Sequence, residues 1–406
     1  MPLALLALAV GAFAIGTTEF VITGLLEEVA RSFGVTDSVA GLAATAYALG
    51  VVAGAPALAL LGTRTTRKQM LMWLMGVFIA GNLLTAVAPT FELLLAGRVI
   101  ASLAHGAFFG IGAIVAADLV PPRRKAGAIA TMFTGLTLAT VVGVPAGTFI
   151  GQHFGWRTTF LAVAALGAFG ATGIAALLPQ DPRGHHSHGG IRRELAALRD
   201  TQVILAMAMT VLGFGGVFAA ITYIAPIMTG AAGFSDGSMP WLLVLFGLGM
   251  VAGNLLGGRL ADRAPMRMLS AALAGLGLTL ALFTIAAHHK ASAAAFLVLI
   301  GMFGFATVPP LQKRVLDHTT QAPTLASAVN IGAFNLGNAL AAWLGGLALS
   351  SGLGTTSPSA VGAVLATTAL GLALLAGSLQ ARRGQHPHDA DHPHTPARGH
   401  HGLPQR

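Results

Sequence analysis

The 406-residue sequence contains no cysteine, and only 9% of its residues are charged. The missing cysteine excludes a disulfide framework, a thiol nucleophile and a zinc–thiolate site. Soluble domains carry about 25% charged residues, so this shortage of charge is unusual for a soluble protein. Hydrophobic residues make up 55% of the chain. Long apolar runs with so few charges are typical of a protein that crosses a membrane several times.

Two motifs of enzymes and pumps are also missing, because the sequence has neither HExxH nor GxxxxGK[ST]. Ser102 and His105 are three residues apart in one apolar run, but a pair on one helix lacks the oxyanion pocket of a hydrolase. Clustered histidines in the middle and at the end of the chain have no ordered carboxylates beside them. We therefore expect no enzyme, no ATP-driven pump, no cofactor and no specific metal site.

Twelve apolar runs are long enough to cross a hydrocarbon core, which needs about 20 residues per helix. They lack the alternating pattern of strands, so the sequence predicts an all-α membrane protein with twelve transmembrane helices. The runs are residues 3–26, 38–62, 70–88, 93–119, 126–151, 158–178, 202–227, 240–261, 268–287, 292–311, 325–349 and 359–380.

Basic residues are distributed unevenly between these runs. If the N-terminus is cytoplasmic, the cytoplasmic segments hold 19 of the 23 Lys and Arg residues, the outer segments hold 3, and Arg98 lies in a span. Cytoplasmic loops are enriched in Lys and Arg, so this asymmetry predicts that both termini are cytoplasmic. The net charge of +9 comes from these short clusters, a pattern that does not indicate nucleic-acid binding.

A polar segment divides the twelve runs into two sets of six. Its composition and that of the His-rich end of the chain are typical of loops and disordered tails. The predicted organisation is an N-terminal half (1–178), a central cytoplasmic loop (179–201), a C-terminal half (202–380) and a disordered cytoplasmic tail (381–406).

A short internal repeat supports the division into halves. The stretch GVVAG at 50–54 recurs as GMVAG at 249–253, and at the same offset Arg64 corresponds to Arg263. Both stretches end the second run of a set of six and lead into a basic loop. Transporters built from such repeats bind their substrate near the middle of the membrane, where the halves meet.

Glu19 lies within the first apolar run, in the stretch GTTEFVITGLL (16–26). An ionised carboxylate is costly in hydrocarbon, so an acid at this depth faces a cavity or a partner. One interpretation is that Glu19 carries a proton or contacts a cationic substrate. The alternatives are a structural hydrogen bond to Thr17, to Thr18 or to a neighbouring helix, and a place near the outer mouth.

The fourth run contains two further ionisable residues. Arg98 keeps its charge at ordinary pH and needs a carboxylate or carbonyl partner, so it either exchanges partners with Glu19 during proton transfer or forms a fixed pair. His105 lies seven residues later, on nearly the same helix face. It either lines a substrate cavity or is a core histidine bonded to a carbonyl. Asp118 ends the run, and we expect it to pair with the basic cluster at 123–125.

Other polar residues in the runs are weaker candidates for the substrate cavity. Asparagine in lipid must find hydrogen-bond partners, which are either the substrate or neighbouring helices. With His105, the candidate residues are Thr23, Tyr47, Tyr223, Asn330 and Asn335.

Several stretches resemble motifs of one transporter family. GRLADRAPMR (258–267) resembles the signature loop of the major facilitator superfamily, Gly-x-Leu-Ala-Asp-Arg-x-Gly-Arg-Arg/Lys, and ALLGTRTTRK (59–68) is its first-half copy, with Thr63 in place of the acid. GLTLATVVGVPAGTFIG (135–151) resembles the Gly/Pro-rich signature of the drug/proton antiporter branch. The stretches GTTEFVITGLL, HGAFFG and GAFNLGN are similar to those of bacterial arabinose-type and chloramphenicol-type efflux permeases.

The resemblance implies two pseudo-symmetric six-helix halves that work by alternating access. It also implies an inner gate in the basic loops, at Arg64, Arg67, Asp262 and Arg263. In the fifth run, glycines four residues apart form a smooth ridge and a proline bends the helix, so we expect a pliable contact between the halves. These hinge residues are Gly143, Pro145, Gly147 and Gly151.

The expected function is proton-coupled efflux of a small hydrophobic or amphipathic compound such as a drug. The alternative is efflux of a polar metabolite, such as a sugar or purine nucleoside, on the same fold. One intramembrane acid and few aromatic residues fit a neutral or cationic substrate without choosing between these. We expect a monomer in the plasma membrane whose partners are the substrate, protons and lipid.

Overall fold

The computed structural model describes residues 3–35, 37–61, 65–180, 195–196, 198–319 and 323–385. In these residues the regular structure is helical, and twelve helices are long and apolar enough to cross a membrane. The predicted fold class is confirmed. The spans are Leu3–Leu25, Leu42–Leu60, Arg67–Val87, Phe91–Asp118, Pro122–Phe154, Trp156–Leu177, Thr201–Ile221, Met239–Ala261, Pro265–Ala286, Lys290–His318, Pro323–Ser350 and Ser357–Leu379.

Each half contains six of these spans. The first half contains α1 (Leu3–Val21), η1 (Ile22–Leu25), α2 (Leu26–Phe33), α3 (Asp37–Ala40), α4 (Leu42–Leu61), α5 (Arg67–Val87), α6 (Phe91–Asp118), η3 (Pro122–Arg124), α7 (Lys125–Leu138), η4 (Ala139–Gly143), α8 (Val144–Phe154) and α9 (Trp156–Leu177). The second contains α11 (Thr201–Met209), η5 (Thr210–Phe214), α12 (Gly215–Ile221), α13 (Ile224–Pro226), η6 (Ile227–Ala231), η7 (Asp236–Ser238), α14 (Met239–Ala261), α15 (Pro265–Ala286), α16 (Lys290–Ala306), α17 (Val308–His318), α18 (Pro323–Ser350) and α19 (Ser357–Gln385).

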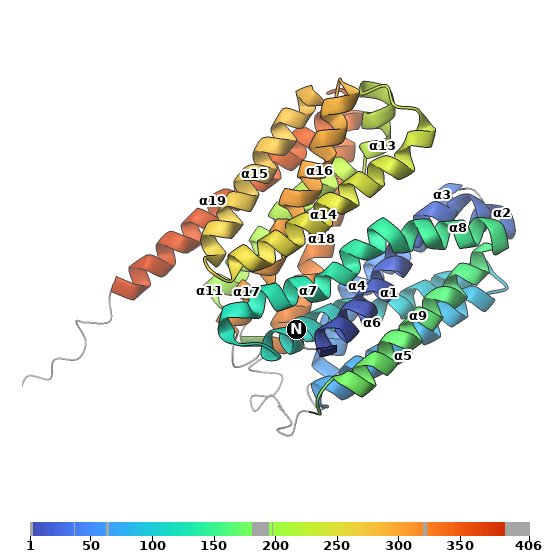
Figure 1. Ribbon diagram of the computed structural model, residues 1–406. Helices are drawn as coiled ribbons and strands as arrows, with labels where there is room; N and C mark the ends of the chain where they lie inside the picture. The colour runs from blue at the N-terminus through green and yellow to red at the C-terminus, as the bar shows by residue number, and fades with distance from the viewer. Residues whose placement is uncertain are drawn as a thin grey trace, which may run out of the picture.

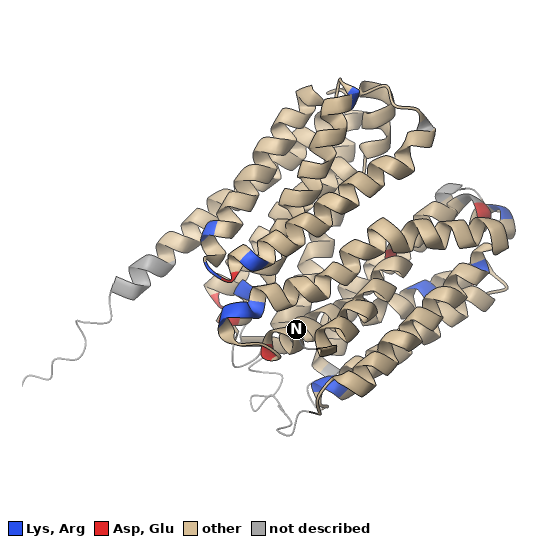
Figure 2. Ribbon diagram, viewed as in Figure 1, with Lys and Arg blue, Asp and Glu red and all other residues tan. Residues whose placement is uncertain are grey.

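Helices α1 to α9 form one bundle and α11 to α19 form the other (Figure 1). The bundles approach each other where the N-terminus lies and diverge toward the opposite end. Most of the Lys and Arg residues gather at the N-terminal side, which we name the basic end (Figure 2). The positive charge predicts that the basic end faces the cytoplasm.

The repeated glycine pairs have equivalent structural roles in the two halves. On α4, a Cβ at Gly54 would lie 2.6 Å from the Cα of Leu103 in α6. On α14, a Cβ at Gly253 would overlap the backbone of Met302 in α16. Glycine is required at both positions because the two backbones approach so closely.

The fifth span is interrupted near its middle. A π-helical turn, η4, separates α7 from α8 just before Pro145, whose missing N–H removes one bond from the helical ladder. The glycine ridge lies on the opposite side of this helix from Pro145 and packs on the first span, where Gly147 faces Val21 and Gly151 faces Leu25. The expected contact of this ridge with the other half is therefore wrong.

Hydrogen bonds close the basic end between the halves. Asp262, just beyond α14, accepts hydrogen bonds from the backbone N–H groups of Ala126 (2.8 Å) and Gly127 (3.0 Å) at the start of α7. Two turns deeper, Asn254 Nδ2 donates to the carbonyl of Ala130 (2.6 Å). Ser327 of α18 donates to the carbonyl of Gly110 in α6 (2.7 Å). Among the described residues, the bonds that cross between the halves lie in this part of the molecule.

Candidate substrate and proton site

A cavity of about 50 Å³ lies between the two halves. Seven of its lining residues are phenylalanines, which come from both bundles, and its polar lining consists of a carboxyl group, an imidazole and two amides. The lining residues are Glu19, Phe20, His105, Phe109, Phe133, Leu136, Phe214, Phe218, Phe305, Val308, Ile331, Phe334, Asn335 and Asn338.

Glu19 forms part of the cavity wall near the end of α1, and 16% of its side chain is exposed. Its Oε2 atom lies 3.9 Å from Nδ1 of His105. In the described part of the chain, no Lys or Arg side chain lies within 4.0 Å of the carboxyl group. Glu19 is therefore neither sealed in lipid nor locked to a permanent cation.

Arg98 is fully buried in α6 and bonds to backbone oxygens of two other spans. Its Nη1 donates to the carbonyl of Thr18 (2.7 Å), its Nη2 to the carbonyl of Glu19 (3.4 Å) and its Nε to the carbonyl of Ala43 (3.3 Å). The first two carbonyls belong to the last turn of α1, where helical carbonyls accept bonds from outside the helix. The guanidinium thus binds the backbone of Glu19 and leaves its carboxyl group facing the cavity.

Tyr47 and His105 lie between Arg98 and the cavity. The guanidinium of Arg98 stacks on the Tyr47 ring, with its carbon 4.4 Å from the ring centre. The Tyr47 hydroxyl lies 3.3 Å from Nδ1 of His105, which itself lines the cavity. Polar contacts therefore run from the buried cation to the carboxyl group through a phenol and an imidazole.

Asn335 and Asn338 place two amides on the cavity wall opposite Glu19, in α18. Asn335 donates to the carbonyl of Ile331 at 3.1 Å, a bond within its own helix. The Oδ1 atom of Asn338 is buried and has no hydrogen-bond partner among the residues that the structure describes. A buried acceptor without a partner is costly, so this oxygen is available to a donor in the cavity.

The other candidate cavity residues lie elsewhere. Thr23 is exposed and donates to the carbonyl of Phe20. Tyr47 is buried behind His105, and Tyr223 donates to the carbonyl of Ala342. Asn330 is fully buried in a network with Thr210 and Gln312 inside the C-terminal half.

The predicted gate residues occupy different positions at the basic end. Asp262 bridges the halves, and Arg263 is exposed beside it. Arg67 pairs with Asp118 at 2.5 Å inside the N-terminal half, so the expected pairing of Asp118 with the cluster at 123–125 is wrong. Arg64 lies outside the described residues. Burial raises the pKa of Asp262 above its usual value, although the backbone N–H groups that it accepts from act against this shift.

Two contact types in this region have no sequence signal. The phenylalanine lining forms one cluster in each half: Phe109 with Phe133 (ring centres 5.1 Å apart), and Phe214 with Phe305 (5.2 Å) and Phe334 (4.9 Å). Phenylalanine in a transmembrane run is ordinary, and which ring faces a cavity depends on how the bundles dock. The hydrogen bond of Asn254 across the halves is the second type, and nothing in the sequence around Asn254 indicates it.

A five-residue run, Gly233–Gly237, fits the letters of the GxSxG pattern found in many hydrolases. That motif requires a sharp turn between a strand and a helix. Here the run follows η6 and its last two residues belong to η7, and the Ser235 hydroxyl contacts the hydroxyl of Ser238 at 3.0 Å. The structural context of a nucleophile is missing from this segment.

The family model described as Major Facilitator Superfamily matches residues 8–342 and, in a second match, residues 232–400. The chain belongs to the Major Facilitator Superfamily. It is 45% identical over 379 residues to the inner membrane transport protein YdhP of Escherichia coli strain K12, a match that covers 93% of this chain and 96% of that protein. It is 35% identical over 372 residues to a chloramphenicol resistance protein of Streptomyces lividans, covering 91% and 95% of the two chains.

Solved structures give the same fold. The transporter FucP in the outward conformation aligns with a TM-score of 0.77 at 15% identity, over 93% of this chain and 98% of that one. The proton:xylose symporter XylE aligns with a TM-score of 0.73 at 15% identity, over 91% and 94% of the two chains. The protein is a multi-pass membrane transporter for a small molecule, and it is not an enzyme.

Proposed function

We propose that this transporter is secondary active and exports a small amphipathic compound in exchange for protons. The observation that carries the proposal is the position of Glu19: its carboxyl group lines a cavity between the two halves, and in the described part of the chain no Lys or Arg side chain lies within 4.0 Å of that group. A carboxyl group that is neutral when protonated and charged when released carries a proton across the membrane as access alternates. We further propose that the transporter works as a monomer in the plasma membrane with both termini in the cytoplasm.

The closed basic end supports alternating access. In this state the bonds of Asp262, Asn254 and Ser327 hold the halves together on the side that we predict to be cytoplasmic. Access from the cytoplasm requires these bonds to break while the opposite ends of the bundles approach each other. The cavity that contains Glu19 then opens to the cytoplasm, and access alternates between the two sides as in other transporters built from two repeats.

The cavity lining favours an amphipathic substrate over a sugar or nucleoside. Seven phenylalanine rings offer apolar and aromatic contact, while the free Oδ1 of Asn338 and the Glu19 carboxyl group offer acceptors at two points. A polyhydroxylated sugar would leave many hydroxyl groups unpaired against these rings, at a cost for each. The similarity to a chloramphenicol resistance protein points in the same direction.

Transport in vesicles tests the proposal. Purified protein in liposomes with an imposed pH gradient is assayed over a panel that contains chloramphenicol, arabinose and purine nucleosides. We expect pH-driven movement of an aromatic amphipathic compound and none of arabinose. Transport of arabinose alone would support the sugar alternative, and transport that ignores the pH gradient would contradict proton coupling.

The variant Glu19→Gln isolates the proton step. We expect it to lose pH-driven transport by at least tenfold, because the amide cannot release a proton, while exchange of labelled for unlabelled substrate continues. Glu92→Gln, at an exposed acid in the first turn of α6, is the matched control and retains transport. Full pH-driven transport by Glu19→Gln would remove Glu19 as the proton carrier.

A further inference from the structure

A large surface groove at the basic end crosses the boundary between the two halves. Its volume is about 1290 Å³, and it is formed by α1 and α7 of one half and α14 of the other. The bonds of Asp262 and Asn254 that close the basic end lie along the same boundary. The shape of the groove therefore depends on the halves being closed at this end.

Four arginines surround the groove, two from each half. Arg123 and Arg124 precede α7, while Arg259 and Arg263 lie at and just beyond the end of α14. All four are exposed, and in the described part of the chain none has a carboxylate within 4.0 Å. Asp262 lies among them, but both of its oxygens accept bonds from the start of α7.

The wall of the groove below the arginines is apolar and open to the surroundings. Leu6 of α1 is 49% exposed, Leu138 of α7 is 40% exposed, and Leu256 and Leu260 of α14 are each 46% exposed. In a membrane protein, exposed leucines of a transmembrane helix face lipid chains. The groove therefore combines a cationic rim at the membrane surface with an apolar wall inside the membrane.

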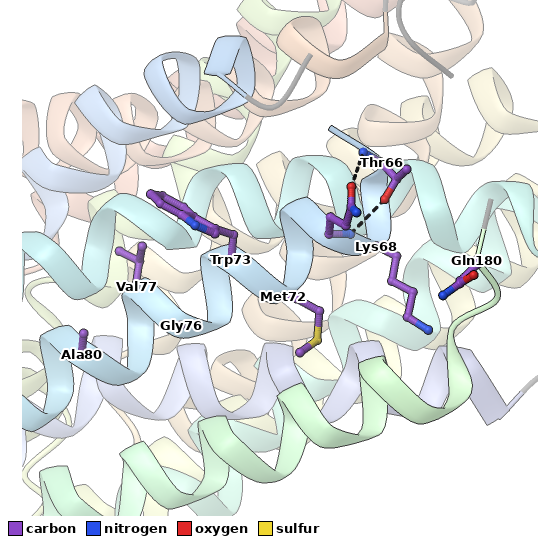
Figure 3. A pocket seen from close by; sticks show the side chains of 9 residues that line it. Thr66, Lys68, Met72, Trp73, Gly76, Val77, Ala80 and Gln180 are labelled. Atoms are coloured by element: carbon purple, nitrogen blue, oxygen red, sulfur yellow. Dashed lines mark hydrogen bonds between the residues drawn. The ribbon is translucent and has the colours of Figure 1, made fainter. Parts of the chain in front are cut away.

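A second groove at the same end provides a comparison (Figure 3). It has a volume of about 870 Å³ and lies along α5, with Lys68 as its cation. Lys68 Nζ donates to the carbonyls of Ala175 and Leu178 at the end of α9, both at 2.7 Å. The Lys68 ammonium group is thus bound to carbonyls of the protein, whereas the four arginine side chains of the larger groove have no such partners among the described residues.

We propose that the groove between α1, α7 and α14 binds an anionic phospholipid of the surrounding bilayer. The phosphate accepts hydrogen bonds from arginines of both halves, and the acyl chains lie on the leucine wall. Basic pockets between transmembrane helices on the cytoplasmic side bind anionic head groups in this way. The lipid offsets the repulsion among four like charges that closure brings together, so it stabilises the closed basic end.

Lipid binding is measured on the full-length protein without substrate or pH gradient, so the result is independent of the transport proposal. The protein in nanodiscs of phosphatidylcholine is titrated with phosphatidylglycerol, and retained lipid is counted by native mass spectrometry. The double variant Arg123→Gln/Arg259→Gln removes one arginine from each half and is expected to weaken binding at least tenfold, at about fivefold per arginine. Arg267→Gln/Lys313→Gln removes two basic-end charges outside the groove and should leave binding within twofold of the parent protein.

A conformational measurement tests the second part of the proposal. The chain has no native cysteine, so Ala176→Cys on α9 and Ala271→Cys on α15 allow specific spin labelling of two exposed positions, one in each half. We expect phosphatidylglycerol to increase the population with a short distance across the basic end, and inorganic phosphate to have no such effect. The arginine double variant should not respond to the lipid.

Three results would overturn the proposal. The first is equal retention of phosphatidylglycerol by the parent protein and the Arg123→Gln/Arg259→Gln variant. The second is an equal loss of binding in the control variant, which would indicate nonspecific attraction to the charged surface. The third is an unchanged distance distribution in the parent protein when phosphatidylglycerol is added.

Discussion

Arg98 shows how the chain retains a permanent charge within its spans. The side chain is fully buried, and it is stabilised by backbone carbonyls of α1 and α4 and by the face of the Tyr47 ring. Carbonyl oxygens carry partial negative charge, so they solvate the cation without neutralising it. Consequently the protonation of Glu19 can change while the position of Arg98 stays the same.

Replacing Arg98 with lysine tests this interpretation. A lysine keeps the charge, but its single ammonium group cannot reach the carbonyls of both α1 and α4 as the planar guanidinium does. We expect Arg98→Lys to destabilise the protein by about 1.5–3 kcal/mol, the range for hydrogen bonds to a charged group. Thermal unfolding in detergent measures the change, with Arg267→Lys, at an exposed arginine of α15, as the control. If Arg98→Lys were as stable as the parent protein, the several N–H donors of the guanidinium would not contribute to stability.

At the scale of single residues, the sequence predicts which ionisable side chains matter better than it predicts which groups they contact. Glu19, Arg98 and His105 were found because charge and imidazole are rare in apolar runs, and the structure brings the three together. Their connection through Tyr47 was not predictable, because it depends on the relative rotation of α4 and α6. Asn330 and Asn335 looked alike in sequence, yet one lies in a buried network and the other on the cavity wall.

At the scale of elements, glycine decides which helices lie closest. The ridge of α7 and α8 allows the first span to pack against it, and the wide turn η4 lies in the same helix just before Pro145. The spacing of the glycines predicted a smooth surface. Which helix packs on that surface could not be predicted from the sequence, since every transmembrane helix offers a similarly apolar face.

A pair of alanine substitutions measures the value of this ridge. A Cβ at Gly147 would lie 2.6 Å from Cγ2 of Val21, whereas a Cβ at Gly76 in α5 meets no atom within 4 Å. We expect Gly147→Ala to destabilise the protein by about 1–3 kcal/mol through overpacking. Gly76→Ala should stabilise it by about 0.5–1 kcal/mol through helix propensity. Unfolding in detergent compares them, and equal effects of the two substitutions would contradict the packing role of the ridge.

At the scale of the whole molecule, the two halves contact each other through short polar bridges at one end. The twelve spans and their division into two sets of six were predictable, because length, apolarity and loop charge are additive along the chain. Which end is closed was not predictable, since a transporter of this kind has alternative arrangements of nearly equal free energy.

Asp262 is the bridge that mutation tests most directly. In Asp262→Asn only one oxygen remains to accept from the two backbone N–H groups, and the favourable charge at the start of α7 is lost. We expect a shift of about 2 kcal/mol, or ~30-fold, toward an open basic end. The spin-label pair on α9 and α15 reports it as an increase in the long-distance population.

The control for this measurement is Asp317→Asn, at the same end of the molecule. Asp317 pairs with Lys313 within α17 and makes no bond to the other half in the described residues. We expect its distance distribution to match that of the parent protein. A shift of the same size in both variants would assign the effect to the loss of negative charge rather than to the bridge.

The small size of the central cavity affects whether ions can leak through the protein. Drug-sized ligands occupy pockets of about 300–1,000 Å³, whereas this cavity measures about 50 Å³. In the described part of the chain, the space between these aromatic rings is therefore too small to hold a continuous column of water along which ions could leak. A molecule that enters the cavity must first separate these phenylalanine rings. Only a compound whose contacts with the rings replace the contacts between them keeps the rings apart.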